Sequence, residues 1–143
     1  MALIDDIEKL AERITALREA EELAIDINRQ MLPELRKLHY ASLKSLNSMA
    51  KRLLRGRISL GGKPPKIPIE FVERLFVLLR DQAEMEWTRS LKLSGSEQRK
   101  SKVQADKLAR LAHQAAVSLK IVAESRGIWN DKYVSEHGLD AWL

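Results

Sequence analysis

Basic residues are concentrated in one segment of the chain. Between Leu35 and Ile69 the sequence has nine lysines and arginines and no acidic residue. They are Arg36, Lys37, Lys44, Lys51, Arg52, Arg55, Arg57, Lys63 and Lys66. Residues 1–32, in contrast, include eight acidic and four basic side chains. A block of one sign projects a field that a well-mixed surface would cancel, and ammonium and guanidinium groups neutralise phosphates. The pattern therefore indicates a polyanionic partner.

The spacing of these residues suits a helix that follows a phosphate backbone. Lys37, Lys44 and Lys51 recur every seven residues, which places them about 10 Å apart along one side of a helix. Arg52 and Arg55 share their face. The opposite face is apolar and is formed by Leu35, Leu38, Leu46, Met49 and Leu53. A second, weaker basic face is expected on a later helix, formed by Arg99, Lys100, Lys107 and Arg110. Two such faces could hold a duplex from two sides.

The kind of nucleic acid follows from what the basic face lacks. Proteins that bind single strands interleave aromatic side chains with their cations, and here only Tyr40 lies on the basic arc. The long helices do not match a compact helix-turn-helix motif, which sequence-specific readout usually needs. We therefore expect contacts to the backbone of double-stranded DNA, independent of its sequence.

Two other interpretations of the basic segment stay open. A charged outer face is also typical of any solvated amphipathic helix, although a merely solvated face normally mixes both signs. A basic amphipathic helix can also lie on an anionic membrane, but the tryptophan expected at such an interface is missing from residues 34–55. The lack of acids favours the nucleic-acid interpretation.

Catalytic and metal-binding patterns are weak in this sequence. The three histidines, His39, His113 and His137, lie on separate predicted elements, and none forms a metal-ligand pair. Gly61-Gly62-Lys63 lacks the full spacing of a phosphate-binding loop, and the chain has no cysteine. We expect no catalytic residue, no metal, no cofactor and no small-molecule substrate.

The elements that position the basic residues are expected to be helices. Six glycines and four prolines in 143 residues leave little room for the turns of a β-rich fold. Apolar periodicity predicts an all-α fold with four main amphipathic helices in a single domain, 1–143. Their ranges are about 3–31, 34–55, 69–93 and 96–126.

Prolines and glycines predict how these helices connect. Pro33 predicts a bend or a stop after the first helix, and the basic Gly/Pro-rich segment 56–68 predicts a stiff connector. Residues 127–143 are expected to pack as a C-terminal clip. The length of the helices favours an extended arrangement over a compact bundle. We expect no membrane span and no secretory signal.

Two short stretches resemble the all-helical chorismate mutases. Ile4 to Arg13 is similar to the first helix of that family, and Pro68 to Phe76 is similar to the start of its last helix. The resemblance implies that Arg13 would bind the carboxylates of the substrate. The position of the family's active-site glutamine is Trp87 here, so we expect that the protein is not an enzyme.

In its architecture the whole chain resembles the major coat proteins of filamentous archaeal viruses. These proteins are small, basic, free of cysteine and nearly all helical, with a proline-containing bend between long helices. The resemblance implies a coat subunit that wraps genomic double-stranded DNA, held in A-form, in a helical virion. It also implies partner coat subunits in a homo- or hetero-oligomer, and location in the virion; otherwise the protein is expected in the cytoplasm. A mutase-like enzyme and a helical protein-interaction module remain the alternatives.

Overall fold

The computed structural model describes residues 2–56 and 68–143, and these residues form helices without strands. Four of the helices are long: α1 (Ala2–Ile27), α2 (Leu32–Gly56), α3 (Ile69–Leu91) and α4 (Gly95–Ser125). The fifth, α5 (Asp131–Glu136), is short, and two 3₁₀ turns, η1 (Arg29–Met31) and η2 (Asp140–Trp142), complete the described elements. The all-α prediction is confirmed, and the predicted helix ranges agree closely with the observed ones after residue 32.

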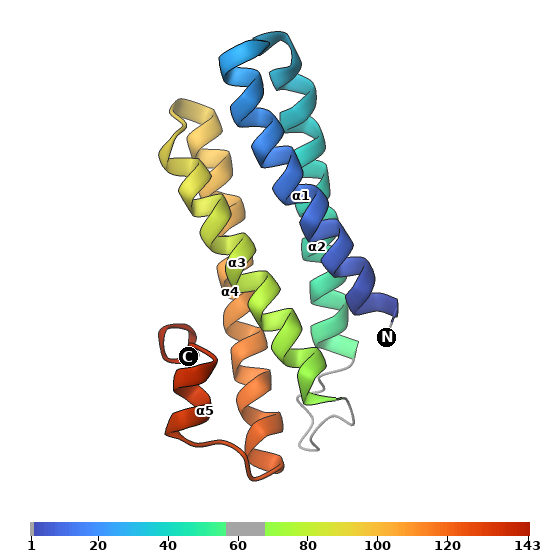
Figure 1. Ribbon diagram of the computed structural model, residues 1–143, viewed down its shortest axis with the longest axis vertical. Coiled ribbons are helices and arrows are strands. Elements are labelled where there is room, and N and C mark those ends of the chain that lie inside the picture. The colour runs from blue at the N-terminus through green and yellow to red at the C-terminus, as the bar shows by residue number, and fades with distance from the viewer. Residues whose placement is uncertain (1, 57–67) are drawn as a thin grey trace.

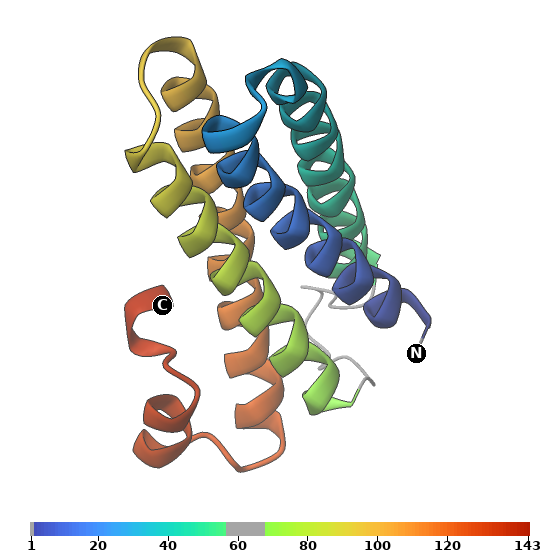
Figure 2. The same ribbon diagram turned by 45° about the horizontal axis from the view of Figure 1, so that its top comes forward.

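The four long helices pack as a bundle of two antiparallel hairpins. Figure 1 shows α1 beside α2 and α3 beside α4, with the C-terminal α5 against the second hairpin. Contacts between α1 and α3 and between α2 and α4 join the two hairpins. The rotated view in Figure 2 shows the same arrangement. The helices therefore fold back on one another, in contrast to the extended arrangement that their length favoured. Their apolar stripes pair within the chain.

The turn between α1 and α2 lies before Pro33, which corrects the predicted first helix. α1 ends at Ile27, and the side chain of Asn28 accepts a hydrogen bond from the backbone N–H of Gln30 at 3.2 Å. Asn28 thus caps η1. Pro33 lies in the first turn of α2, where a missing backbone N–H costs no helical hydrogen bond. α1 and α2 are therefore two helices and not one bent rod.

The interior of the bundle changes character along its length. One half is apolar and includes Ile7, Leu46, Leu75 and Leu108, each fully buried. The other half, towards the α1–α2 turn, contains buried charged and polar side chains that are described below. Burial of the apolar half supplies the main favourable free energy of folding.

Residues 127–143 pack as a clip on the second hairpin, as the sequence predicted. The ring of Trp142 meets that of Phe76 edge-on, with the centroids 6.4 Å apart. His113 Nδ1 on α4 lies 2.6 Å from the backbone oxygen of Trp142, and His137 Nε2 lies 2.8 Å from Glu73 Oε2 on α3.

Among the described helices, none has the length and apolar character that crossing a membrane requires.

Candidate nucleic-acid interface

Two side-chain contacts show how α2 and α4 lie relative to each other. Tyr40 Oη donates to Glu97 Oε2 at 3.2 Å, and Asn47 Nδ2 donates to Gln104 Oε1 at 3.4 Å. The partners in both pairs are 57 positions apart in the sequence. Because the sequence separation is the same in both pairs, the two helices run parallel and side by side, as Figure 1 also shows.

This pairing brings the basic residues of both helices to one side of the bundle. On α2, His39 points into the core, and Tyr40 and Asn47 meet α4. Lys44 and Lys51 lie about 20–60° further around the helix, towards its outer side. On α4, Ser101 points into the core, Gln104 meets α2, and Lys100 and Lys107 follow outward in the same way. The two predicted basic faces therefore border the same line of contact.

We call this surface the basic face. Its residues are Lys37, Lys44, Lys51, Arg52 and Arg55 of α2 and Arg99, Lys100, Lys107 and Arg110 of α4, and all of them are exposed. Within the described part of the chain, Lys100 is the one member in ion-pair range of a carboxylate, with 3.7 Å from its Nζ to Glu97 Oε1. The remaining cations are available to an external anion.

A hollow marks the end of the basic face on α2. It has a volume of about 500 Å³, and Ser48, Lys51, Arg52 and Arg55 line it. Three cationic groups and one hydroxyl donor around a concave surface suit a tetrahedral, doubly or singly charged oxyanion such as a phosphate.

Arg36 lies apart from this group. Its side chain is half-buried, and its Nε lies 3.6 Å from Glu21 Oε2 on α1. The guanidinium therefore faces the first hairpin and not the outer side of α2. Arg57, Lys63 and Lys66, also predicted to contact nucleic acid, lie outside the described residues.

A buried polar cluster, which the sequence did not predict, stabilises this half of the bundle. Its centre is Glu86 of α3, a side chain with no exposed surface. The Glu86 carboxylate lies 3.1 Å from Arg18 Nε of α1 and 2.7 Å from His39 Nε2 of α2. It also accepts hydrogen bonds from Arg89 of the same helix at 3.0 Å and from Ser101 Oγ of α4 at 2.6 Å. All four long helices thus meet at one carboxylate.

The electrostatics of the cluster explain why a buried carboxylate stays ionised. Burial alone would raise the pKa of Glu86, but the hydrogen bonds from His39 and Ser101 and the charge of Arg18 lower it to about 2. Burial likewise opposes the charged form of Arg89, but hydrogen bonds to Glu21 and Tyr40 raise the pKa of its guanidinium. Both oxygens of Glu86 are already engaged, so the cluster positions helices and offers no free general base.

A sequence signal for the cluster existed on α3. Gln82, Glu86 and Arg89 follow Leu75 and Leu79 at helical steps of three and four, so charged residues continue an apolar stripe. Charges at such positions are almost never fully buried unless they are paired. The residues that pair with Glu86 lie on α1, α2 and α4, and the apolar pattern of α3 alone does not identify them.

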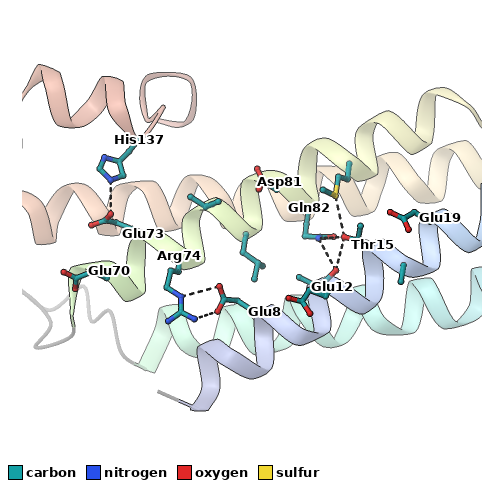
Figure 3. Close-up of a pocket in the computed structure, with 15 residues that line it drawn as sticks. Glu8, Glu12, Thr15, Glu19, Glu70, Glu73, Arg74, Asp81, Gln82 and His137 are labelled. Carbon is teal, nitrogen blue, oxygen red and sulfur yellow. Dashed lines mark hydrogen bonds and ion pairs between the residues drawn. The ribbon is translucent and has the colours of Figure 1, made fainter.

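An acidic groove lies between α1 and α3, on the side of the bundle opposite the basic face. Figure 3 shows the side chains that line it, and its volume is about 700 Å³. Its carboxylates are Glu8, Glu12, Glu19, Glu70, Glu73 and Asp81, and its apolar lining includes Val77, Leu78 and Met85. Arg74 bridges the two helices through Glu8 and Asp5, and Gln82 donates to Thr15 at 3.3 Å. The groove offers negative charge over an apolar floor.

The positions implied by the mutase resemblance do not meet in one pocket. Arg13 is exposed on α1 and is absent from the lining of the acidic groove. Trp87 is 46% exposed on α3, and the ammonium group of Lys102 lies 5.8 Å from its ring centroid. Among the described residues, no group of three or more His, Cys, Asp or Glu side chains is arranged to hold a metal ion.

The basic face, the buried cluster and the acidic groove are thus polar features that the described helices position. Comparisons with models of protein families, with curated proteins and with solved structures found no match to this chain.

Proposed function

We propose that this protein binds the backbone of double-stranded DNA through its basic face, without regard to base sequence, and that it acts structurally. The observation that carries the proposal is the parallel packing of α2 and α4, which joins their exposed cations on one side of the bundle. Neutralising phosphates releases condensed counterions, so several such cations supply affinity without base contacts.

A duplex suits this surface better than a single strand. The cations of α2 recur at about 10 Å, and a second row on α4 runs alongside them, so backbone contacts can extend along both helices. Tyr40, the aromatic residue nearest to the face, is half-buried and hydrogen-bonds with Glu97 and Arg89. Its ring is therefore a poor platform for stacking bases.

In its most concrete form, the proposal is that the chain is a coat subunit that wraps genomic DNA in a helical virion. Helices of 25 and 31 residues, α2 and α4, with cations along one side would present an extended surface to a duplex. The partners would be the DNA and further coat subunits, identical or homologous.

Binding of random-sequence duplex at a series of salt concentrations tests the DNA proposal. We expect affinity to fall steeply between about 50 and 200 mM salt. The triple variant Lys44→Gln, Lys51→Gln, Lys107→Gln should reduce the slope of log K against log salt by about 3, since each lost phosphate contact contributes about 0.9. A control triple, Lys9→Gln, Lys120→Gln, Lys132→Gln, removes the same charge elsewhere and should leave most of the slope intact.

Two outcomes would contradict the proposal. A flat salt response would exclude backbone binding, and equal losses in the two triple variants would exclude the basic face as its site. Electron microscopy of the protein mixed with duplex tests the coat form separately, because a coat subunit should form regular filaments and a dispersed DNA-binding protein should not.

A helical interaction module remains a second candidate, and one observation favours it. Leu23 and Ile27, near the end of α1, are 60% and 75% exposed, and Leu38, near the start of α2, is 52% exposed. Large exposed apolar side chains close to one turn are typical of a protein contact. A stable complex with another protein, undisturbed by duplex, would support this candidate.

A further inference from the structure

We propose that, in the absence of nucleic acid, the acidic α1/α3 side of one copy docks onto the basic face of a second copy. The inference goes beyond the proposed function, because it gives a partner to a surface that DNA binding leaves unused. It also does not require that the protein bind DNA.

The first support is a match in spacing between two rows of opposite charge. Asp5, Glu12, Glu19 and Asp26 recur every seven residues on α1, and we call them the acidic row. Lys37, Lys44 and Lys51 recur every seven residues on α2, and we call them the basic row. Both rows therefore have a repeat of about 10 Å along a helix, so successive pairs can form together.

The second support is that both rows are open to an external partner. All seven side chains are exposed. Glu12 and Glu19 line the acidic groove, and within the described residues neither lies in ion-pair range of a basic side chain. Asp5, in contrast, already pairs with Arg74 at 3.0 Å. Glu12 and Glu19 are therefore the residues of the acidic row that carry the inference.

The fold prevents the two rows from meeting within one copy. α1 contacts α2 and α3, whereas α4 contacts α2 and α3, so the α1/α3 and α2/α4 sides are opposite sides of the bundle. Figures 1 and 2 show the same order of helices. A contact between unlike surfaces of identical copies is heterologous, and it repeats as a ring or an open chain.

The shape of the acidic groove fits lysine side chains. Figure 3 shows Glu12 and Glu19 along α1, with Glu70, Glu73 and Asp81 across the groove on α3. Val77 and Met85 on its lining are 37% and 39% exposed. The aliphatic stem of a lysine can cover such apolar surface while its ammonium group reaches a carboxylate. A second copy of α2 supplies these stems at the required interval.

The sedimentation of the full chain without nucleic acid tests the inference. At 50 mM salt the mean mass should rise with protein concentration, and at 500 mM it should return to that of one copy, because exposed pairs are screened. Two variants reverse one row each: Glu12→Lys with Glu19→Lys, and Lys44→Glu with Lys51→Glu. Each alone should remain a single copy at 50 mM salt. An equimolar mixture of the two should associate, because one variant then has two basic sides and the other two acidic sides.

A control pair separates docking from a general effect of charge. Glu124→Lys with Glu136→Lys makes the same change on α4 and α5, away from both rows, and should associate like the unmodified chain. The inference is overturned if the unmodified chain stays a single copy at 50 mM salt, or if the equimolar mixture does not associate.

Duplex binding then distinguishes this inference from the proposed function. If the chain self-associates but does not bind duplex, the docking stands and the DNA proposal fails. If it binds duplex but never self-associates, the DNA proposal stands and the docking fails. If both hold, the two partners share Lys44 and Lys51, and excess duplex should dissociate the copies.

Discussion

His39 Nε2 on α2 lies 2.7 Å from Glu86 Oε1 on α3, which joins helices at opposite corners of the bundle through its centre. Arg18 and Ser101 reach the same carboxylate from the remaining two corners. A single buried charge therefore sets the relative positions of α2 and α4, the two helices whose alignment forms the basic face. Breaking a buried ionic cluster by removing one member is costly, because its partners stay buried without compensation.

The first prediction concerns Glu86→Gln. The pKa of this carboxyl falls from 4.5 in the unfolded chain to about 2 in the fold, which corresponds to about 3 kcal/mol of stability. Because the folded pKa is the lower one, this contribution is present above pH 4.5 and is lost as the pH falls towards 2. Glu86→Gln should therefore reduce the free energy of unfolding by about 3 kcal/mol at pH 7, and by less at pH 3. Urea unfolding followed by circular dichroism measures both.

Glu84→Gln is the matched control, because Glu84 is exposed on the same helix. It should change the free energy of unfolding by no more than about 0.5 kcal/mol at either pH. A Glu86→Gln deficit of the same size at pH 7 and pH 3 would contradict the ionised state assigned to this carboxyl.

The second prediction concerns Asn47, which is buried between α2 and α4. Its Oδ1 has no hydrogen-bond partner within the described structure, and its one hydrogen bond, to Gln104, is long at 3.4 Å. Asn47→Leu removes the unpaired Oδ1 from the interior, and the partner that it leaves, Gln104, is part-exposed, so water can replace the lost hydrogen bond. Asn47→Leu should raise the free energy of unfolding by about 1 kcal/mol. Ser45→Leu, exposed on the same helix, should stay within about 0.5 kcal/mol and corrects for helix propensity. A loss of stability in Asn47→Leu would show that this amide is required.

The third prediction concerns the C-terminal clip. Trp142 is half-buried and packs edge-on against Phe76, whereas Trp87 is 46% exposed. Trp142→Ala should lower the free energy of unfolding by about 3 kcal/mol, and Trp87→Ala should lower it by about 1 kcal/mol. Guanidinium titrations of the two variants make the comparison. If Trp142→Ala lost no more than about 1 kcal/mol, the clip would contribute little to the stability of the bundle.

Much of the fold could be predicted from the sequence, because the apolar residues recur at steps of three and four along each long helix. The end of α1 could not, since its apolar stripe continues through Ile27 to Met31. The turn depends instead on the side chain of Asn28, a local hydrogen bond that overrides the periodicity. The bundle itself depends on which stripes pair, and periodicity does not specify that pairing.

The candidate site was predictable in its residues and not in its assembly. Helical spacing put Lys44 and Lys51 on one face of α2 and Lys107 on one face of α4. Their joining on one surface depends on the parallel packing of α2 and α4, which the contacts of Tyr40 and Asn47 with α4 reveal and helical spacing does not. Arg36 shows the limit of predicting a face from helical spacing. Its position in the sequence puts its Cα at the edge of the basic face of α2, but its guanidinium group faces Glu21 on α1. A projection locates a Cα, and a long side chain can still reach a partner on another helix.

The last prediction uses Arg36 and Lys37, which are neighbours in sequence but differ in environment. Lys37 is exposed on the basic face, whereas Arg36 is half-buried beside Glu21. Lys37→Gln should reduce the salt slope of duplex binding by about 0.9 and leave stability within about 0.5 kcal/mol. Arg36→Gln should leave the slope unchanged and lower the free energy of unfolding by about 1 kcal/mol, since it removes a partly buried ion pair. Each variant is the control for the other, so the two measurements should show opposite patterns. If Arg36→Gln reduced the slope as much as Lys37→Gln, the guanidinium would have to leave Glu21 when DNA binds, and the basic face would extend around α2 towards the first hairpin.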